Sequence, residues 1–116
     1  MLSNNPQELD LDSVFDALSN SKRRAMLDIL SQRPATVAQL ARDLDISLPS
    51  IHRHIRTLEG AGLIQRRKVG RVNFVAIRRP SLAAAQNWIQ RFHLELGHDD
   101  ATLENFIARM REEGHR

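Results

Sequence analysis

The stretch DISLPSIHRHIRTLEGAGLIQRRKVGRVNFVAI, residues 45–77, decides the fold, because a helical pattern is followed at once by two short strand patterns around a glycine. From residue 47 to residue 79 the chain carries eight Arg and Lys side chains and one acidic side chain, Glu59, whereas the remainder carries nine basic and thirteen acidic ones. The net charge of +3 therefore conceals a basic segment on an acidic chain. This distribution is typical of a surface that binds a polyanion, although a solvated charged face gives the same pattern.

The first half of the stretch predicts a helix that begins after Ser47, the expected N-cap. Pro49 lies in the first turn, where its missing N–H costs little. Leu48 lies nearer the apolar face than the outer face, so we expect it to pack against the core rather than to contact a thymine methyl group. Gly60 and Gly62 mark the end of the helix. The apolar face is formed by Ile51, Ile55 and Leu58.

A second helix is predicted immediately before this one. Thr36 and Gln39 form a capping-box pattern, and apolar residues follow at helical spacing as far as Leu44. Because a turn of about three residues joins the two helices, the pair is typical of a helix-turn-helix. The segments LIQRRK and RVNFVAI then predict a β-hairpin around Gly70, a wing directly after the second helix.

Four further helices flank this centre. We expect the first from residue 9, the second capped by Ser21, the fifth capped by Ser81, and the sixth capped by Asp99 or Asp100. The predicted fold is mainly α with a small β-hairpin: four helices, two strands, then two helices. Residues 1–8 are expected to form a flexible N-terminus, and residues 9–113 a single winged-helix DNA-binding and dimerisation domain.

The composition limits the class of protein. The apolar fraction of 41% and the charged fraction of 27% are those of a soluble globular protein. No apolar run approaches the ~20 residues of a membrane span, and the N-terminal dozen residues are too polar and acidic for a signal peptide. The chain has no cysteine, which excludes disulfides and thiolate metal sites and suits a reducing cytoplasm.

The order of these elements, with the segments DALSNSKRRAMLDIL, TVAQLARDLDIS, SIHRHIRTLEGAGLI and RRKVGRVNFVAI, resembles the ArsR-type winged-helix repressors. The resemblance implies a winged helix-turn-helix that dimerises through its first and last helices and binds operator DNA, a cytoplasmic, nucleoid-associated protein. This chain resembles a cysteine-free member. Asp45 stands where many members have Gly, and Asp tolerates the left-handed backbone conformation that the turn then needs.

The predicted DNA-binding side chains lie on the outer face of residues 47–60, on the wing, and at the start of the supporting helix. Arg53 is the best candidate for a base contact, because its guanidinium can donate two bonds to guanine; a phosphate contact is the alternative. His54 is expected to have a structural, hydrogen-bonded role. Arg23 and Arg24 are expected to be solvated, with a contact to the DNA backbone as the alternative. The full predicted set is Thr36, Gln39, Ser47, Pro49, Ser50, His52, Arg53, Arg56, Arg66, Arg67, Lys68 and Arg71.

A homodimer is expected through apolar side chains that a small core need not bury: Leu11, Phe15, Trp88, Phe92, Phe106 and Met110. These residues can also complete the monomer core. We expect no cofactor, no metal ligands, no membrane partner and no enzymatic activity, and the sequence identifies no effector. Two other functions are compatible with the pattern. One is a metal-responsive repressor that uses His and Asp ligands such as His98, and the other is a winged helix that binds RNA or protein.

Overall fold

The computed structural model describes residues 10–92 and 102–114. The chain divides into two compact units, residues 1–86 and 87–116. The prediction of a single domain over residues 9–113 stays a prediction.

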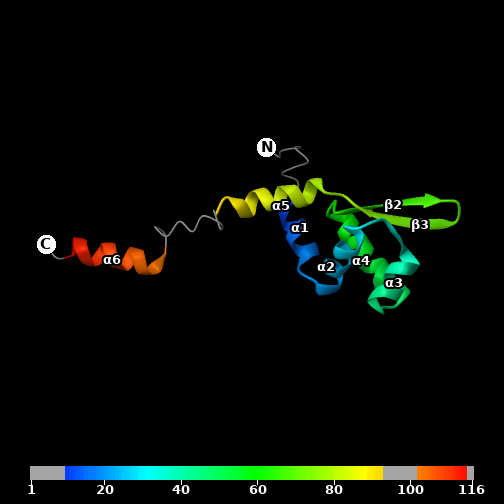
Figure 1. Ribbon diagram of the computed structural model, residues 1–116, viewed down its shortest axis with the longest axis horizontal. Helices are drawn as coiled ribbons and strands as arrows, with labels where there is room; N and C mark the ends of the chain where they lie inside the picture. Colours follow the sequence, from blue (N-terminus) through cyan, green and yellow to red (C-terminus); the bar gives the residue numbers. More distant parts are fainter. Residues whose placement is uncertain (1–9, 93–101, 115–116) are drawn as a thin grey trace. The chain divides into compact units, whose positions relative to one another are not determined.

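The first unit follows the predicted order of elements, with one short strand added (Figure 1). It contains α1 (Leu11–Leu18), α2 (Ser21–Leu30), β1 (Ala35–Thr36), α3 (Val37–Leu44), α4 (Leu48–Gly60), β2 (Ile64–Val69), β3 (Val72–Ile77) and most of α5 (Pro80–Gln90).

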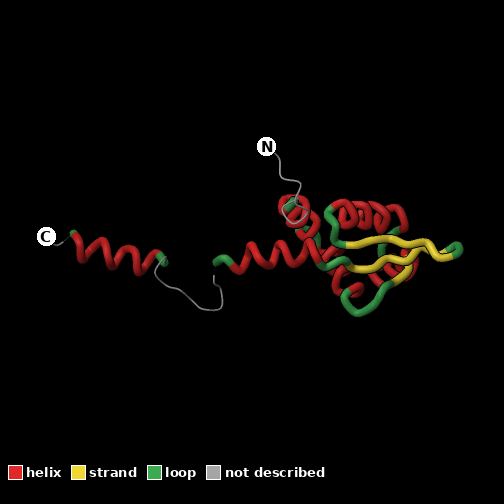
Figure 2. The backbone as a smooth tube through the Cα atoms, turned by 90° about the horizontal axis from the view of Figure 1, so that it is seen from above, coloured by secondary structure: helices red, strands yellow, loops and turns green. Residues whose placement is uncertain are grey.

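The three strands form an antiparallel sheet in the order β1-β3-β2. β1 pairs Ala35 with Val75, and the β2–β3 hairpin ends with Val69 opposite Val72. β1 was not predicted, because a strand of two residues shows no alternation of apolar and polar side chains. The hairpin extends beyond the helices as the wing (Figure 2). Gly70 has φ +63° and Arg71 has no positive φ, the combination that a type II′ turn requires.

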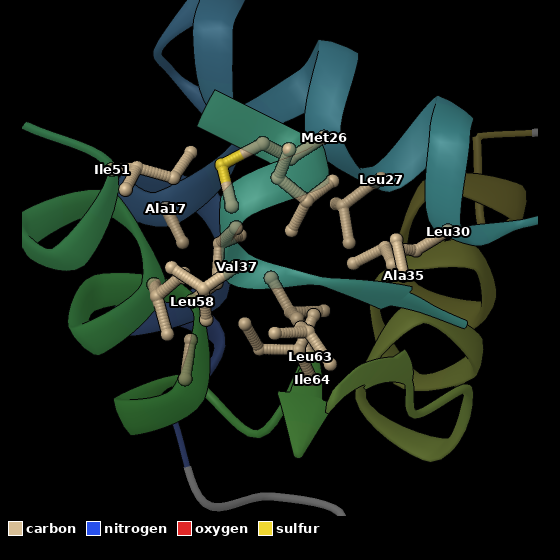
Figure 3. Close-up of a cluster of buried hydrophobic side chains, with 14 of the residues drawn as sticks. Ala17, Met26, Leu27, Leu30, Ala35, Val37, Ile51, Leu58, Leu63 and Ile64 are labelled. Carbon is tan, nitrogen blue, oxygen red and sulfur yellow. The ribbon is translucent and has the colours of Figure 1, made fainter. Parts of the chain in front are cut away.

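The core lies where α1, α2, α3 and α4 meet the inner face of the sheet, and Figure 3 shows many of its side chains. Met26 of α2 and Leu40 of α3 are completely buried. So are the three residues predicted to form the inner stripe of α4, which are Ile51, Ile55 and Leu58. Burying a side chain of this size stabilises a fold by roughly 1.5–3 kcal/mol, so the stripe fixes which face of α4 points outward.

The turn between α3 and α4 is closed by backbone hydrogen bonds. Asp45 takes the left-handed conformation, with φ 54° and ψ 51°, as the resemblance implied. Its N–H donates to the Arg42 carbonyl at 3.2 Å, and the N–H of Ile46 donates to the Ala41 carbonyl at 3.0 Å. These two bonds form a Schellman motif. Ile46 packs against the core, so the turn that begins α4 is held by both bonds and packing.

Several predicted helix caps are confirmed and others are wrong. Thr36 and Gln39 form both bonds of the capping box, and Ser47 caps α4. Asn20, not Ser21, caps α2, because its side chain is one residue ahead of the first helical position and accepts from the Arg23 N–H.

The last two helices also begin elsewhere than predicted. α5 begins at Pro80, one residue before the expected cap Ser81, because proline is suited to a first helical position. The N-cap of α6 is Thr102, whereas the predicted caps Asp99 and Asp100 lie outside the described residues.

The second unit holds the end of α5 and all of α6 (Leu103–Glu113). The rings of Trp88 and Phe92 make an edge-on contact, with centroids 5.0 Å apart. α6 has no buried residue, and its apolar stripe, including Phe106 and Met110, is exposed. No helix in the described part of the chain is both long and apolar enough to cross a membrane.

Gly62, which follows α4, takes φ +76°, and a Cβ at this position would lie 2.8 Å from the Ser81 Oγ. A left-handed backbone costs a residue with a Cβ about 1–2 kcal/mol, and Ser81 would also have to shift. We therefore expect Gly62→Ala to lower the free energy of unfolding by about 2 kcal/mol, measured by urea denaturation.

The Ser81→Ala variant is the matched background for this change. It removes the Oγ and leaves the backbone strain at Gly62 in place. Gly62→Ala should therefore cost less in the Ser81→Ala protein than in the wild type. An equal cost in both backgrounds would contradict the contact between the end of α4 and the start of α5.

Candidate nucleic-acid interface

The outer face of α4 is open to solvent, in the arrangement predicted from the helical spacing. Ser47, Pro49, Arg53 and Arg56 are exposed, and Ser50 is half-buried. The Ser47 Oγ accepts a hydrogen bond from the Ser50 N–H at 3.3 Å, so its first role is to cap the helix. A helix N-terminus with further free N–H groups favours an anion nearby.

Arg53 is bonded within its own helix. Its Nη2 donates to the Ser50 Oγ at 3.0 Å, which directs the guanidinium back along α4 toward Ser47. Within residues 10–92 and 102–114, no carboxylate neutralises Arg53. One N–H of the guanidinium is thus held by Ser50, and others remain available for a ligand.

Leu48 is placed differently from the sequence prediction. It is 54% exposed, although its position around the helix is closer to the buried stripe than to the outer face. Leu48 is the first residue of α4, almost one turn before Ile51, where the buried stripe of the helix begins. The expected packing of Leu48 is therefore wrong, and an apolar side chain adjoins Ser47 and Pro49 at the start of the exposed face.

His54 has the structural role predicted for it. Its half-buried ring lies beside Arg23, whose Nη1 is 3.4 Å from the His54 Nδ1. An arginine only donates, so Nδ1 is the acceptor and a neutral His54 carries its proton on Nε2. Partial burial lowers the pKa of His54 below its ordinary value, and the positive charges of Arg23 and Arg53 lower it further. His52 is half-buried on the other flank of the outer face.

The basic side chains at the start of α2 donate to the ends of neighbouring helices, a role that the prediction of solvated arginines did not include. Arg24 is exposed as predicted, whereas Arg23 is half-buried. Arg23 donates to the carbonyls of Ala17 at 2.7 Å and Asp16 at 3.0 Å, and Arg24 donates to that of Leu18 at 2.8 Å. Lys22 Nζ donates to the Leu44 carbonyl at the end of α3 at 3.1 Å.

These acceptors are among the last carbonyls of α1 and α3, the groups that a helix leaves without a partner from a following turn. The Asp16 carbonyl also accepts from the N–H and the Oγ of Ser19, the C-cap of α1. Cations at a helix C-terminus are stabilising because they donate to these carbonyls and because they interact favourably with the helix dipole. The sequence places three cations shortly after the end of a helix, a pattern that is compatible both with this capping role and with a solvated surface.

In the wing, Arg67, Lys68 and Arg71 are exposed around Gly70. Arg66 is different, because its Nε and Nη2 donate to the two carboxylate oxygens of Glu59 at 3.2 and 3.0 Å. The Arg66–Glu59 contact is the one ion pair in the described ranges, and each of the two side chains is 35% exposed. Such pairs contribute only about 0–1 kcal/mol, so this bridge mainly orients the end of α4 and the base of β2.

At the start of α3, the predicted contacts Thr36 and Gln39 are engaged with each other's backbone. The Gln39 N–H donates to the Thr36 Oγ1 at 3.0 Å, and the Thr36 N–H donates to the Gln39 Oε1 at 2.9 Å. Gln39 is exposed and Thr36 is half-buried. The Gln39 amide N–H groups are not used by the capping box and can still meet a phosphate.

No three His, Asp or Glu side chains gather to hold a metal ion among the residues described. His98, with Asp99 and Asp100, lies outside those residues, as do the other C-terminal histidines, His93 and His115. The described surface instead combines an exposed helix N-terminus, two unneutralised arginines on α4 and a cationic wing. This arrangement can neutralise phosphates and donate hydrogen bonds to base edges in a DNA groove.

Comparison with known proteins identifies a matching family model and several relatives. Residues 18–67 match a family model described as a helix-turn-helix domain. The HTH-type transcriptional regulator Rv2034 of Mycobacterium tuberculosis is 33% identical over 81 residues, which cover 70% of this chain and 76% of the relative. The transcriptional repressor SdpR of Bacillus subtilis is 30% identical over 82 residues, which cover 71% of this chain and 91% of SdpR.

A solved structure gives the same result at the level of the fold. The crystal structure of the ArsR family transcriptional regulator RHA00566 is 39% identical in sequence. It superposes with a TM-score of 0.68, covering 80% of this chain and 93% of that chain.

The lowered pKa of His54 has a consequence for stability. Because the unfolded chain binds a proton more readily at this residue, stability falls as the pH drops below about 6.5 and passes through the lower pKa of the folded state. We expect the melting temperature of His54→Gln to fall less between pH 7.5 and 5.5 than that of the wild type. Glutamine offers Arg23 an amide oxygen and does not titrate.

His52→Gln is the matched control, since it removes a histidine from the same helix without touching the Arg23 contact. It should keep the wild-type fall in melting temperature. Identical pH profiles for His54→Gln and the wild type would contradict the role assigned to His54.

Proposed function

Because this chain belongs to the ArsR-type winged helix-turn-helix transcriptional regulators, we propose that it is a repressor that binds a palindromic operator as a homodimer. It is a DNA-binding regulator and not an enzyme. We place its action in the cytoplasm, on the DNA of the nucleoid. The name of SdpR, a transcriptional repressor, supports repression over activation.

One observation carries the proposal. The complete burial of Ile51, Ile55 and Leu58 turns the opposite face of α4 outward, and that face carries Arg53 and Arg56 without carboxylate partners in the described part of the chain. The major groove of B-DNA is wide enough to admit a helix, and the N-terminal turns of such a helix usually meet the base edges. We assign α4 to the major groove and Arg53 to a base.

The other cations supply affinity more than sequence choice. Arg67, Lys68 and Arg71 around the wing tip suit the phosphates or the minor groove, where the negative potential attracts arginine. Ser47, Ser50, His52 and the side chain of Gln39 suit phosphates on the near strand. Arg66 is included in the proposed DNA-binding set because of its position on β2, although Glu59 already pairs with its charge.

The dimer is supported by the apolar side chains that the described structure leaves open. Phe92, Phe106 and Met110 are 60%, 53% and 54% exposed, and Trp88 is 38% exposed. Exposed apolar clusters of this kind usually mark interaction sites. Leu11 and Phe15 are partly buried against the core, so they contribute only their outer surface. Two copies related by a two-fold axis would bind half-sites about one helical turn apart.

Selection of bound sequences from a random pool of duplex DNA tests the proposal. We expect a palindrome whose half-sites lie about 10 base pairs apart, bound less tightly as the salt concentration rises. A structured RNA competitor should displace the selected duplex poorly. A chain that enriches no sequence, or that prefers the RNA, would contradict operator binding.

Arg53→Ala should weaken binding to the selected operator by about 1–3 kcal/mol and binding to random DNA much less, because the lost bonds are to one base. Fluorescence anisotropy with both DNAs measures the difference. Arg67→Ala is the control, since a phosphate contact should cost about the same on both. Equal losses on both DNAs for Arg53→Ala would assign Arg53 to phosphate.

Sedimentation at micromolar concentration should give a dimer, and Phe106→Asp should shift it toward monomer because a charge enters the apolar contact. Val69→Asp is the matched control, since Val69 is 57% exposed on the wing and lies outside the proposed dimer surface. It should remain dimeric. A monomeric wild type, or a dimer insensitive to Phe106→Asp, would contradict the proposed surface.

A further inference from the structure

Leu48 is the first residue of α4 and is 54% exposed. A single exposed leucine is common on protein surfaces, so exposure alone assigns no role. Its location is what matters, because it stands between the exposed residues Ser47 and Pro49 at the end of the helix that enters the groove. Cβ atoms of a helix tilt toward its N-terminus, so the Leu48 side chain projects ahead of the first turn.

The direction of Leu48 differs from that of Arg53. At 3.6 residues per turn, Leu48 lies about 60° around the axis from the buried Ile51, and Arg53 lies about 160° from it on the opposite side. The two side chains thus point about 140° apart. The Ser50 Oγ holds the Arg53 guanidinium near the same end of the helix. One end of α4 therefore presents a cationic donor and an apolar side chain in different directions.

We propose that Leu48 contacts the 5-methyl group of a thymine and makes the protein select thymine at one position of each half-site. This inference rests on the proposed operator binding. Thymine is the standard base that presents a methyl group in the major groove, where an apolar side chain can contact it. Burying one such group changes affinity by about fourfold, and two symmetric half-sites double that effect on the logarithmic scale to about fifteenfold.

Replacing thymine by uracil tests this, because uracil lacks the methyl group and keeps the same hydrogen-bonding atoms. Each thymine of the selected operator is replaced in turn, symmetrically in both half-sites, and binding is measured by fluorescence anisotropy. We expect one position to weaken binding about fifteenfold and Leu48→Ala to weaken the thymine site by a similar factor. Leu48→Ala should no longer distinguish thymine from uracil there.

Leu48→Met is the conservative control, since it keeps an apolar side chain of similar volume and should keep the preference for thymine. Leu48 packs little against the core, so both variants should melt near the wild-type temperature. The inference is overturned if every thymine can be replaced without effect, or if Leu48→Ala still prefers thymine at the sensitive position. In both cases the unmodified operator remains bound, so operator binding survives. A protein that selects no sequence loses both proposals.

Discussion

Burial of one apolar stripe on α4 sets the orientation on which the rest of the structure depends. Ile51, Ile55 and Leu58 are completely buried, and α4 cannot rotate about its axis without exposing them. Each such exposure would cost roughly 1.5–3 kcal/mol, a large share of the stability of a small domain. The cationic side chains of α4 then have one available direction, away from the core. An exposed arginine is not itself evidence of a binding site. Here a packing constraint presents it on a helix beside a cationic wing, and this combination supports the proposed DNA-binding surface.

The hydrogen bonds show which of the basic side chains are already paired within the protein. Counting basic residues places Arg23, Arg24 and Lys22 in the acidic remainder of the chain, yet they close the C-termini of α1 and α3. They lie in the first turn of α2, where the dipole of α2 itself disfavours them, and the exposed carbonyls of the neighbouring helices offset that cost. Arg66 is likewise committed to Glu59. On α4 and the wing tip, the cations left for a polyanion are therefore Arg53, Arg56, Arg67, Lys68 and Arg71.

Local sequence rules predicted the features that depend on neighbours along the chain. The capping box of α3 and the Ser47 cap follow from side chains within a few residues of the backbone that they close. The left-handed Asp45 was expected from the family resemblance, with Asp in place of Gly. Features that depend on distant parts of the chain were missed. β1 exists because Ala35 pairs with Val75, and neither residue carries a local signal for it. Leu48 lies within about 60° of a buried residue, but helical angle alone does not say where the core ends. The contacts assigned to DNA stay predictions, since they depend on a second molecule.

Arg23 connects α1, which carries part of the proposed dimer contact, to α4, which carries the proposed DNA contact. It donates to the carbonyls of Asp16 and Ala17 at the end of α1 and to His54 on α4. α1 carries part of the proposed dimer contact, whereas α4 carries the arginines that we assign to the DNA groove. Because one guanidinium and a shared core hold both helices, the position of α4 relative to α1 is a property of packed side chains and not of a loop. Packed interiors resist small displacements. A dimer contact on α1 would therefore set the distance between the two α4 helices, and the spacing of the half-sites would follow from the same core that orients each helix.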